Sequence, residues 1–268
     1  MRIASEKWEV EVDPKHGANL DSVRYDGRPV YRAGCFAEEP FFQGAAMLLP
    51  SNRTGDGIFT FRGKTYRLPL NEPQNGCHLH GSLYERSFTV TEQTENQVTM
   101  VYENSGACYP FSFWLEVTYR VGEELLQRYR ITAREAMPLT FGLHSAFPAP
   151  QRFRVPLEST QQKDDRHRPT GRYIPLTAAE QEYCDGGTSE GRVISGYYRS
   201  AGTVAWLDDL RMEVSPNFDH WILFNARGER GFLCVEPQAG AVDGLNNGCC
   251  TVLEQGETVE FWVKLSVE

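Results

Sequence analysis

Two stretches of the chain place histidines in settings that are unusual for exposed loops. In residues 75–81, glycines lie on either side of His78 and His80 and permit tight backbone geometry. In residues 141–148, His144 is a single imidazole within an otherwise apolar run. Imidazoles and carboxylates are the side chains that most often transfer protons in enzymes, so these positions are candidates for acid–base chemistry.

Glu236 is the carboxylate best placed to work with them. It follows the apolar run 232–235 and precedes Pro237, which stops a strand. A carboxylate at the end of a buried strand is desolvated enough to be a competent base and remains within reach of a substrate.

Each candidate also has a purely structural interpretation. A lone histidine in an apolar run is usually a packed core residue, and a carboxylate at a strand end is usually solvated. Arg53 is by default a surface guanidinium. The remaining histidines, His16, His167 and His220, are interpreted as ordinary surface or structural residues.

A period of two residues dominates the chain and predicts the elements that must position these side chains. Apolar residues alternate with polar ones at Trp8, Val10 and Val12, and again in the runs 111–119 and 259–267. Such alternation is typical of strands with one face on a core. Further strands are expected around residues 59–61, 87–90, 98–102, 128–132, 203–206, 211–214, 221–224 and 232–235.

Turn signals separate these runs at Asp26-Gly27, Arg62-Gly63, Val121-Gly122 and Arg227-Gly228. One short helix is expected over residues 177–184, with Thr177 as its N-cap and Glu180 three residues later. Many short strands with regular turns predict an all-β protein, a large antiparallel β-sandwich. No internal repeat or linker divides it, so residues 1–268 form one domain, with 151–196 as a long loop region or rim insertion.

Composition and charge limit the kinds of partner and the compartment that the sequence predicts. A net charge of -9 argues against nucleic acid or an anionic membrane. The first thirteen residues are too charged for a signal peptide, and no stretch approaches the roughly 20 apolar residues of a membrane span. The 7 cysteines show no CxxC spacing, so reduced thiols in a cytoplasmic protein are expected. The oligomeric state is left open.

A series of short motifs follows in a fixed order along most of the chain. They are Gly17-Ala18-x-Leu20, Leu49-Pro50-Ser51-Asn52-Arg53, Gly57-x-Phe59-x-Phe61-x-Gly63-x-x-Tyr66-x-Leu68, His78-Leu79-His80-Gly81, Tyr109-Pro110, His144, Cys234-Val235-Glu236-Pro237-Gln238 and Leu253-x-x-Gly256-Glu257. The series resembles the aldose 1-epimerase (galactose mutarotase) family, in which an Asn-Arg pair precedes a Phe/Gly/Tyr hairpin and a His-Gly loop.

The resemblance implies a galactose mutarotase-like supersandwich and a cofactor-independent isomerase, with no metal, that interconverts the α and β anomers of a free hexose. It implies Glu236 as the base at the C1 hydroxyl and His144 as the acid at the ring oxygen, with His80 bound to the same oxygen. These roles require an ionised Glu236 and a protonated His144, which opposite charges in one pocket favour. The substrate-binding residues that it implies are Arg53, Asn52, His78 and Gln238. Trp114 and Phe147 are candidates for an aromatic face beneath the sugar.

One departure concerns sugar specificity. Family members have an Asp, followed two residues later by an aromatic residue, between the second histidine and the glutamate. The corresponding stretch here, residues 194–198, contains no Asp, and Asp185 is a candidate substitute.

Three other functions stay open. His78, His80 and Glu85 match the first metal motif of cupins, which bind Zn, Fe or Mn through imidazoles and a carboxylate. A non-catalytic carbohydrate-binding protein on the same fold is a second alternative. A sugar 6-phosphate mutarotase is the third, and it would need a cationic cluster, for which the sequence offers Arg152, Arg154, Arg166 and Arg168.

Overall fold

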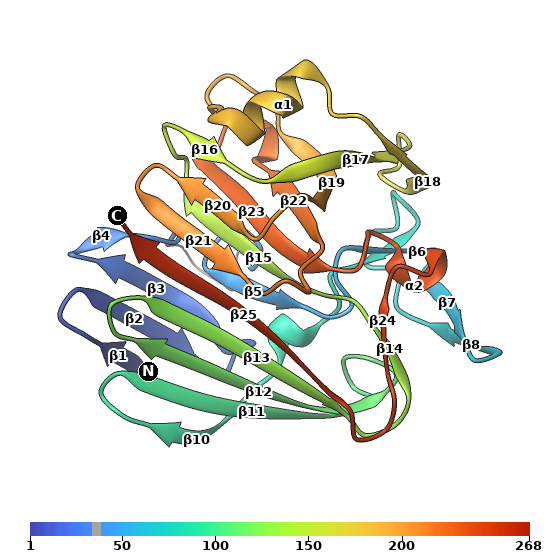
Figure 1. Cartoon of the computed structure of the whole chain (residues 1–268). Coiled ribbons are helices and arrows are strands. Elements are labelled where there is room, and N and C mark those ends of the chain that lie inside the picture. The colour runs from blue at the N-terminus through green and yellow to red at the C-terminus, as the bar shows by residue number, and fades with distance from the viewer. Residues whose placement is uncertain (34–38) are drawn as a thin grey trace.

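Strands make up most of the regular structure, as the period-two patterns predict (Figure 1). The structure is a computed structural model that describes residues 1–33 and 39–268, so Cys35 lies outside the described residues. The strands form an eight-stranded and a seven-stranded sheet, a four-stranded sheet at the N-terminus, and three two-stranded ribbons. The all-β antiparallel sandwich is therefore confirmed.

The eight-stranded sheet contains the longest alternating runs. Its order is β10 (Thr89–Gln93), β11 (Gln97–Ser105), β12 (Ser112–Val121), β13 (Leu125–Ala133), β25 (Thr258–Val267), β21 (Leu210–Val214), β20 (Val204–Leu207) and β16 (Phe153–Arg154). Phe113, Leu115 and Val117 of β12 are fully buried, whereas their neighbours Ser112, Trp114 and Glu116 are half-buried. The alternation thus puts one face of this sheet on the core.

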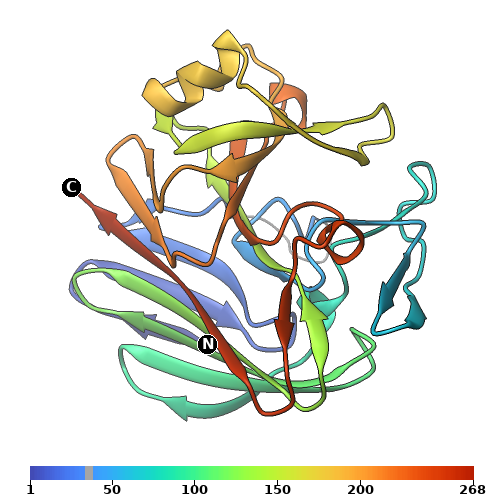
Figure 2. The same cartoon turned by 45° about the vertical axis from the view of Figure 1, so that its right-hand side comes forward.

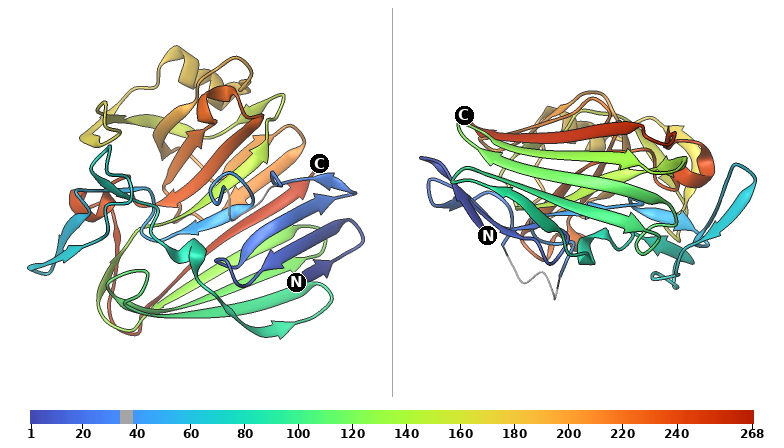
Figure 3. Two further views of the ribbon diagram at one scale, coloured as in Figure 1. Left: turned by 180° about the vertical axis from the view of Figure 1, so that it is seen from behind. Right: turned by 90° about the horizontal axis from the view of Figure 1, so that it is seen from below.

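A small sheet packs against β10–β13 and comes forward when the molecule is seen from behind (Figure 3). Its order is β1 (Arg2–Ala4), β2 (Trp8–Asp13), β3 (Asn19–Tyr25) and β4 (Arg28–Pro29). The predicted turn at Asp26-Gly27 connects β3 to β4. Trp8, Val10 and Val12 are fully buried in the main core, as the pattern predicts.

The seven-stranded sheet holds both central candidates. Its order is β18 (Pro169–Ile174), β17 (Leu157–Lys163), β19 (Ser195–Ser200), β22 (His220–Phe224), β23 (Phe232–Ala239), β15 (Phe141–Pro148) and β5 (Ala45–Leu48). Strands β15 and β23 are neighbours, although about ninety residues of chain separate them.

Short elements close the edges of the molecule. The ribbons pair β6 (Arg53–Gly55) with β9 (Cys77–Leu79), β7 (Ile58–Phe61) with β8 (Lys64–Arg67), and β14 (Met137–Leu139) with β24 (Thr251–Leu253). Short helical turns are η1 (Leu83–Glu85), η2 (Ala226–Gly228) and α2 (Gly244–Asn247). The β7–β8 hairpin turns at the predicted Arg62-Gly63 and projects away from the sheets (Figure 2).

The region 151–196 is more regular than the sequence indicates. Strands β17 and β18 extend the seven-stranded sheet, so this region is not simply a loop or an insertion. The predicted helix is present as α1 (Ala178–Asp185), and Thr177 and Glu180 form the expected reciprocal capping box. No helix among residues 1–33 and 39–268 is long and apolar enough to cross a membrane.

The main core joins the sheets through aromatic contacts. Phe141 of β15 is fully buried, with its ring centroid 5.0 Å from that of Phe261 on β25 and 5.5 Å from that of Tyr129 on β13. Phe141 therefore ties the strand that carries His144 to the opposite sheet.

Truncating this contact is expected to destabilise the fold strongly. Phe141→Ala should lower the free energy of unfolding by about 3–5 kcal/mol, because a buried ring is lost and a cavity remains. Urea unfolding followed by tryptophan fluorescence measures this change. Val193→Ala, at a side chain that is 68% exposed, is the control and should change the value by less than about 0.5 kcal/mol. A loss at Phe141 no larger than that of the control would contradict this description of the core.

Candidate active site

His144 and Glu236 lie side by side on the seven-stranded sheet. The register pairs Gly142 with Gln238 and Ala146 with Cys234, which places His144 directly opposite Glu236. Odd-numbered residues of β15 face the main core, so His144 projects from the other face. Its Nε2 atom lies 3.4 Å from Oε1 of Glu236, and both side chains are buried.

His80 reaches the same place from the loop after β9. Its ring centroid is 5.1 Å from that of His144, and the two rings are nearly perpendicular. The backbone N–H of His80 donates to the carbonyl of Asn52 at 2.9 Å. Gly81 follows with φ +66°, and a Cβ there would lie 2.0 Å from the carbonyl oxygen of Leu49, so only glycine fits. This close approach of the two loops fixes where His80 sits.

Arg53 is held by partners that the sequence did not reveal. Its Nε and Nη2 atoms donate to the two carboxylate oxygens of Glu72, each at 2.7 Å. Its Nη1 atom donates to the hydroxyl of Tyr197 at 2.6 Å and to Oδ1 of Asn52 at 3.5 Å. The guanidinium is therefore neutralised by Glu72 while it faces the cavity. Glu72 had no motif to mark it, whereas Tyr197 lies in the stretch 194–198 that the resemblance aligned with the family's sugar-binding segment.

These side chains line one cavity of about 240 Å³. Phe41, Phe42 and Phe224 form its apolar wall. Trp114 and Phe147, the aromatic residues expected from the sequence, are not part of it: Phe147 is in the main core and Trp114 is on β12. The remaining lining residues are Asn52, Arg53, Glu72, Leu79, His80, His144, His167, Ser195, Tyr197, Ile222, Leu223 and Glu236. His167, interpreted from the sequence as ordinary, is thus a lining residue.

Two of the expected binding residues lie outside the lining of this cavity. His78 is buried, and its Nδ1 atom is 2.7 Å from the carbonyl oxygen of Pro69, to which it donates. Gln238 is buried as well and donates to the carbonyl of Gly240 at 3.0 Å. Both side chains thus hydrogen-bond to backbone carbonyls of neighbouring segments.

The alternative sites do not assemble at this cavity. Among the described residues, no group of three potential metal ligands within 4.8 Å includes His78, His80 or Glu85, so the cupin motif is wrong. Arg152, Arg154 and Asp185 line a separate surface pocket, beside β16. Asp185 therefore does not replace the family's Asp.

Burial controls the protonation of the central pair. Desolvation raises the pKa of the Glu236 carboxyl well above its usual range, and the charge of Arg53 opposes this only in part. Desolvation also lowers the pKa of the His144 imidazole to about 3 and that of His80 well below its usual value. Burial thus disfavours the charged form of both groups and favours a neutral resting pair over the ionised Glu236 and protonated His144 expected from the sequence.

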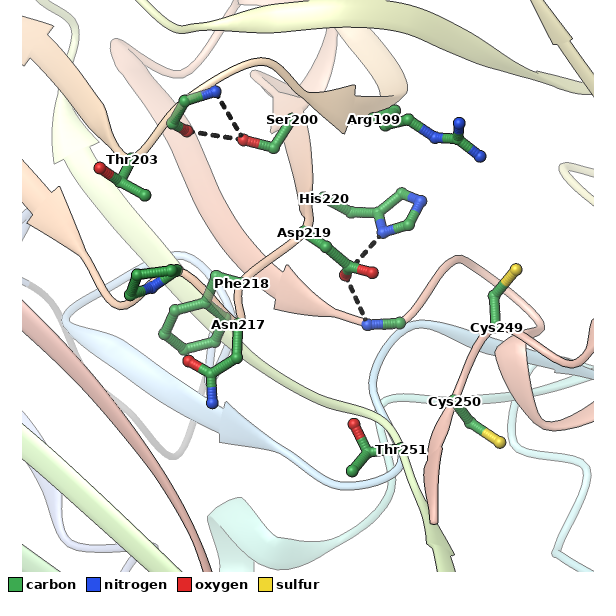
Figure 4. Close-up of a pocket in the computed structure, with 13 residues that line it drawn as sticks. Arg199, Ser200, Thr203, Asn217, Phe218, Asp219, His220, Cys249, Cys250 and Thr251 are labelled. Carbon is green, nitrogen blue, oxygen red and sulfur yellow. Dashed lines mark hydrogen bonds and ion pairs between the residues drawn. The ribbon is translucent and has the colours of Figure 1, made fainter.

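A second cavity, of about 490 Å³, has Arg199, Asp219 and His220 among its lining residues (Figure 4). His220 at its edge is structural, as expected: Nδ1 contacts Asp219 at 2.8 Å and Nε2 contacts the Tyr173 hydroxyl at 2.7 Å. Residues 240–243 form a strap that begins at Gly240, in the lining of the second cavity, and packs Val242 on Tyr197 and Ile222 of the first. Asp219 accepts from the N–H of Gly240, and Gln161 bonds both the N–H and the carbonyl of Val242.

Comparisons with known proteins identify the family of the chain. The aldose 1-epimerase family model matches residues 5–266, nearly the whole chain. The chain belongs to the aldose 1-epimerase family. A family member from rat, galactose mutarotase, is 31% identical over 117 residues, which cover 42% of this chain and 34% of that protein. An uncharacterized protein of Escherichia coli is 26% identical over 134 residues, which cover 48% of this chain and 44% of that protein. The matched segments thus span less than half the length of these relatives.

Solved structures show the same fold as this family member. A galactose mutarotase-like protein from Clostridium acetobutylicum superposes with a TM-score of 0.91 at 22% identity, covering 100% of this chain and 94% of that one. A putative aldose 1-epimerase from Escherichia coli gives a TM-score of 0.88 at 18% identity, covering 100% and 98%. The galactose mutarotase-like fold and the epimerase family are therefore shown.

The buried carboxyl of this family member is expected to cost stability. In the unfolded chain Glu236 is solvated, with an ordinary pKa near 4.5, and it releases its proton above that pH while the folded form retains it. The free energy of unfolding therefore falls as pH rises toward the raised pKa of the folded state. Glu236→Gln should be more stable than wild type at pH 7, by about 1.4 kcal/mol for each tenfold change in the acid constant.

Urea unfolding at several pH values measures the difference in stability between Glu236→Gln and wild type. This difference should disappear below the ordinary pKa of glutamate. Glu229→Gln, at an exposed position, is the matched control and should show no such pH dependence. A Glu236→Gln protein that is less stable than wild type at pH 7 would show that the carboxyl is ionised and held favourably in the folded state.

Proposed function

We propose that the protein is an aldose 1-epimerase that interconverts the α and β anomers of a free hexose by acid–base ring opening. The observation that carries the proposal is the buried pair of His144 and Glu236, 3.4 Å apart at the floor of a cavity. Anomer exchange needs one proton removed from the C1 hydroxyl and one delivered to the ring oxygen, and such a pair suffices for both transfers.

The size and lining of the cavity suit a single sugar ring. Its volume of about 240 Å³ is below the roughly 300–1,000 Å³ of pockets for drug-sized ligands. Phe41, Phe42 and Phe224 offer an apolar wall to the C–H face of a sugar, and Arg53 with Tyr197 offers polar atoms to its hydroxyls.

Proton counting reconciles the neutral resting pair with the proposed roles. A protonated Glu236 beside a neutral His144 contains the same single proton as an ionised Glu236 beside a protonated His144. When a sugar binds, its C1 hydroxyl donates a hydrogen bond to the Glu236 carboxylate, and hydrogen bonds to the charged form lower a carboxyl pKa. The proton then passes to His144, which has its Nε2 atom within 3.4 Å.

Ring opening and closure follow from this state. Glu236 accepts the C1 hydroxyl proton while His144 protonates the ring oxygen, and the ring C–O bond breaks to give an open-chain aldehyde. Rotation about the C1–C2 bond presents the other face of the carbonyl. The C5 hydroxyl then attacks this face and returns its proton to His144, as Glu236 protonates the C1 oxygen. His80 donates a second hydrogen bond to the ring oxygen, and no metal or nucleotide takes part.

Replacing either member of the pair should abolish most of the catalysis. Glu236→Gln and His144→Gln should each lower kcat/KM for anomer exchange by about 10²–10⁴-fold, because each removes one proton-transfer group. Polarimetry of freshly dissolved α-galactose, α-glucose and other aldoses measures the rate above the spontaneous background. Glu229→Gln and His16→Gln, at exposed positions, are the matched controls and should retain the wild-type rate.

Each alternative has its own outcome in this assay. Sugar binding without any acceleration would favour a non-catalytic carbohydrate-binding protein. Exchange confined to 6-phosphorylated sugars, and inhibited by inorganic phosphate, would favour the sugar 6-phosphate reaction. None of Arg152, Arg154, Arg166 and Arg168 is among the described residues that line the cavity, and the guanidinium of Arg168 is engaged by Asp56 and by the carbonyls of Asn75 and Gly76.

The pH profile should reflect the depressed pKa of His144. The pair gains a second proton, and so loses its base, only near the His144 pKa of about 3 rather than near the ordinary 6.5. We therefore expect kcat/KM of the enzyme to stay constant between about pH 7 and about pH 5. A titration with a midpoint near 6.5 in kcat/KM would contradict the neutral resting pair.

A further inference from the structure

Cys234 adds a third potential ligand beside His144 and Glu236. It precedes Glu236 by two residues on β23, so both side chains project from the same face of that strand. A nitrogen of His144, the sulfur of Cys234 and an oxygen of Glu236 all lie within 4.8 Å of one another. In the part of the chain that the structure describes, no other three His, Cys, Asp or Glu residues are grouped so closely.

These three side chains are buried yet poorly satisfied. Their exposed fractions are 5% for His144, 0% for Cys234 and 2% for Glu236. Within residues 1–33 and 39–268, the one polar contact of the Glu236 carboxylate is the 3.4 Å approach of His144 Nε2, which is longer than an ordinary hydrogen bond. Two other buried histidines, His78 and His220, do have close hydrogen-bond partners. Buried carboxylates are normally hydrogen-bonded, paired or bound to a metal.

The spacing is close to that of a tetrahedral metal site. With metal–nitrogen and metal–oxygen distances of about 2.0–2.1 Å, two ligands at the tetrahedral angle are about 3.3 Å apart. The observed separation of His144 Nε2 and Glu236 Oε1, 3.4 Å, already matches this value. A sulfur at about 2.3 Å from the metal would lie about 3.5 Å from each of them. The Cys234 sulfur lies within 4.8 Å of both ligand atoms, so a rotation of its side chain would bring it to this distance.

We propose that His144, Cys234 and Glu236 form a binding site for a borderline-soft divalent cation, Zn²⁺ above all, at the floor of the cavity. A thiolate, an imidazole and a carboxylate select Zn²⁺ over Mg²⁺ or Ca²⁺, which take oxygen ligands. On binding, Cys234 and Glu236 release their protons to solvent, and their two negative charges balance the charge of the ion. The fourth coordination position faces the cavity and takes a water molecule.

Metal at this site inhibits anomer exchange. The lone pairs of His144 and Glu236 that would hold the ion are those that transfer protons to and from the sugar, so metal and reaction exclude each other. Cys234 contributes to the metal site alone, because it does not line the cavity. This inhibition rests on the proposed function, whereas the metal site itself rests on geometry.

Cobalt and zinc titrations of the purified chain, after treatment with EDTA and its removal, test the site. Co²⁺ should bind one ion per chain and give a thiolate-to-cobalt charge-transfer band together with the intense visible bands of tetrahedral cobalt. Zn²⁺ should displace it and slow anomer exchange at least tenfold, and EDTA should restore the rate. Mg²⁺ at the same concentration should have neither effect.

Cys234→Ser is the decisive variant, since it keeps the shape of the site and removes the soft ligand. We expect it to lose the charge-transfer band, to bind Zn²⁺ at least tenfold more weakly, and to retain the metal-free exchange rate. Cys108→Ser, at another buried thiol, is the matched control and should behave as wild type. Circular dichroism and urea unfolding verify that both variants fold.

Several results would overturn the metal site: absence of metal binding by the wild type, a charge-transfer band that survives in Cys234→Ser, or one that is lost in Cys108→Ser. Should Cys234→Ser fail to fold, Glu236→Gln serves in its place, and unchanged Zn²⁺ affinity in that variant would likewise reject the site. The spectra are independent of any sugar, so a protein without mutarotase activity could still confirm the site. Catalysis that is unaffected by bound Zn²⁺ would instead reject inhibition, and with it the shared use of the pair.

Discussion

Burial of a carboxyl beside an imidazole, on neighbouring strands of one sheet, is the arrangement on which the rest of the molecule depends. Neither Glu236 nor His144 gains from leaving water, because desolvation disfavours the charged form of each. Their cost is met by the large core on the opposite face of the same strands, where Phe141, Leu143 and Val235 pack. Because alternate residues point to opposite faces, β15 and β23 stabilise the fold with one face and carry the reactive side chains on the other.

The charged groups around Glu236 and His144 help to keep this buried pair neutral. Arg53 is the cation that most favours an ionised Glu236, and a free guanidinium in the cavity would draw the carboxyl toward its charged form. Glu72 takes up the guanidinium through two hydrogen bonds, and Tyr197 takes a third. Arg53 therefore presents hydrogen-bond donors to a substrate with much of its charge already balanced. The neutrality of the central pair results from burial together with this occupied guanidinium.

Sequence reasoning captured the parts that follow from local rules. Period-two alternation placed Trp8, the 111–119 run and the last strand correctly, and turn and capping residues placed the β7–β8 hairpin and α1. The ordered motifs identified the family and, with it, His80, His144 and Glu236 as candidates, which the fold brings to one cavity.

What escaped prediction depends on tertiary placement. Glu72 and His167 enter the cavity from segments far apart in sequence, with no local pattern to mark them. His78 and His80 are two residues apart, so a continuous strand would point them the same way. The positive φ of His80, +66°, ends β9 before it, and the two rings diverge.

The strap of residues 240–243 has a consequence for how the specificity of this protein can evolve. It lies behind the lining of the cavity, where Val242 packs on the lining residues Tyr197 and Ile222. Its backbone is fastened at Val242 by the side chain of Gln161 and at Asp243 by the backbone of Arg53. The side chains in front of it therefore rest on a backbone that is held in place. Space for a longer sugar on this side would come from shorter lining side chains, from a change in the length of the strap, or from loss of the Gln161 tether.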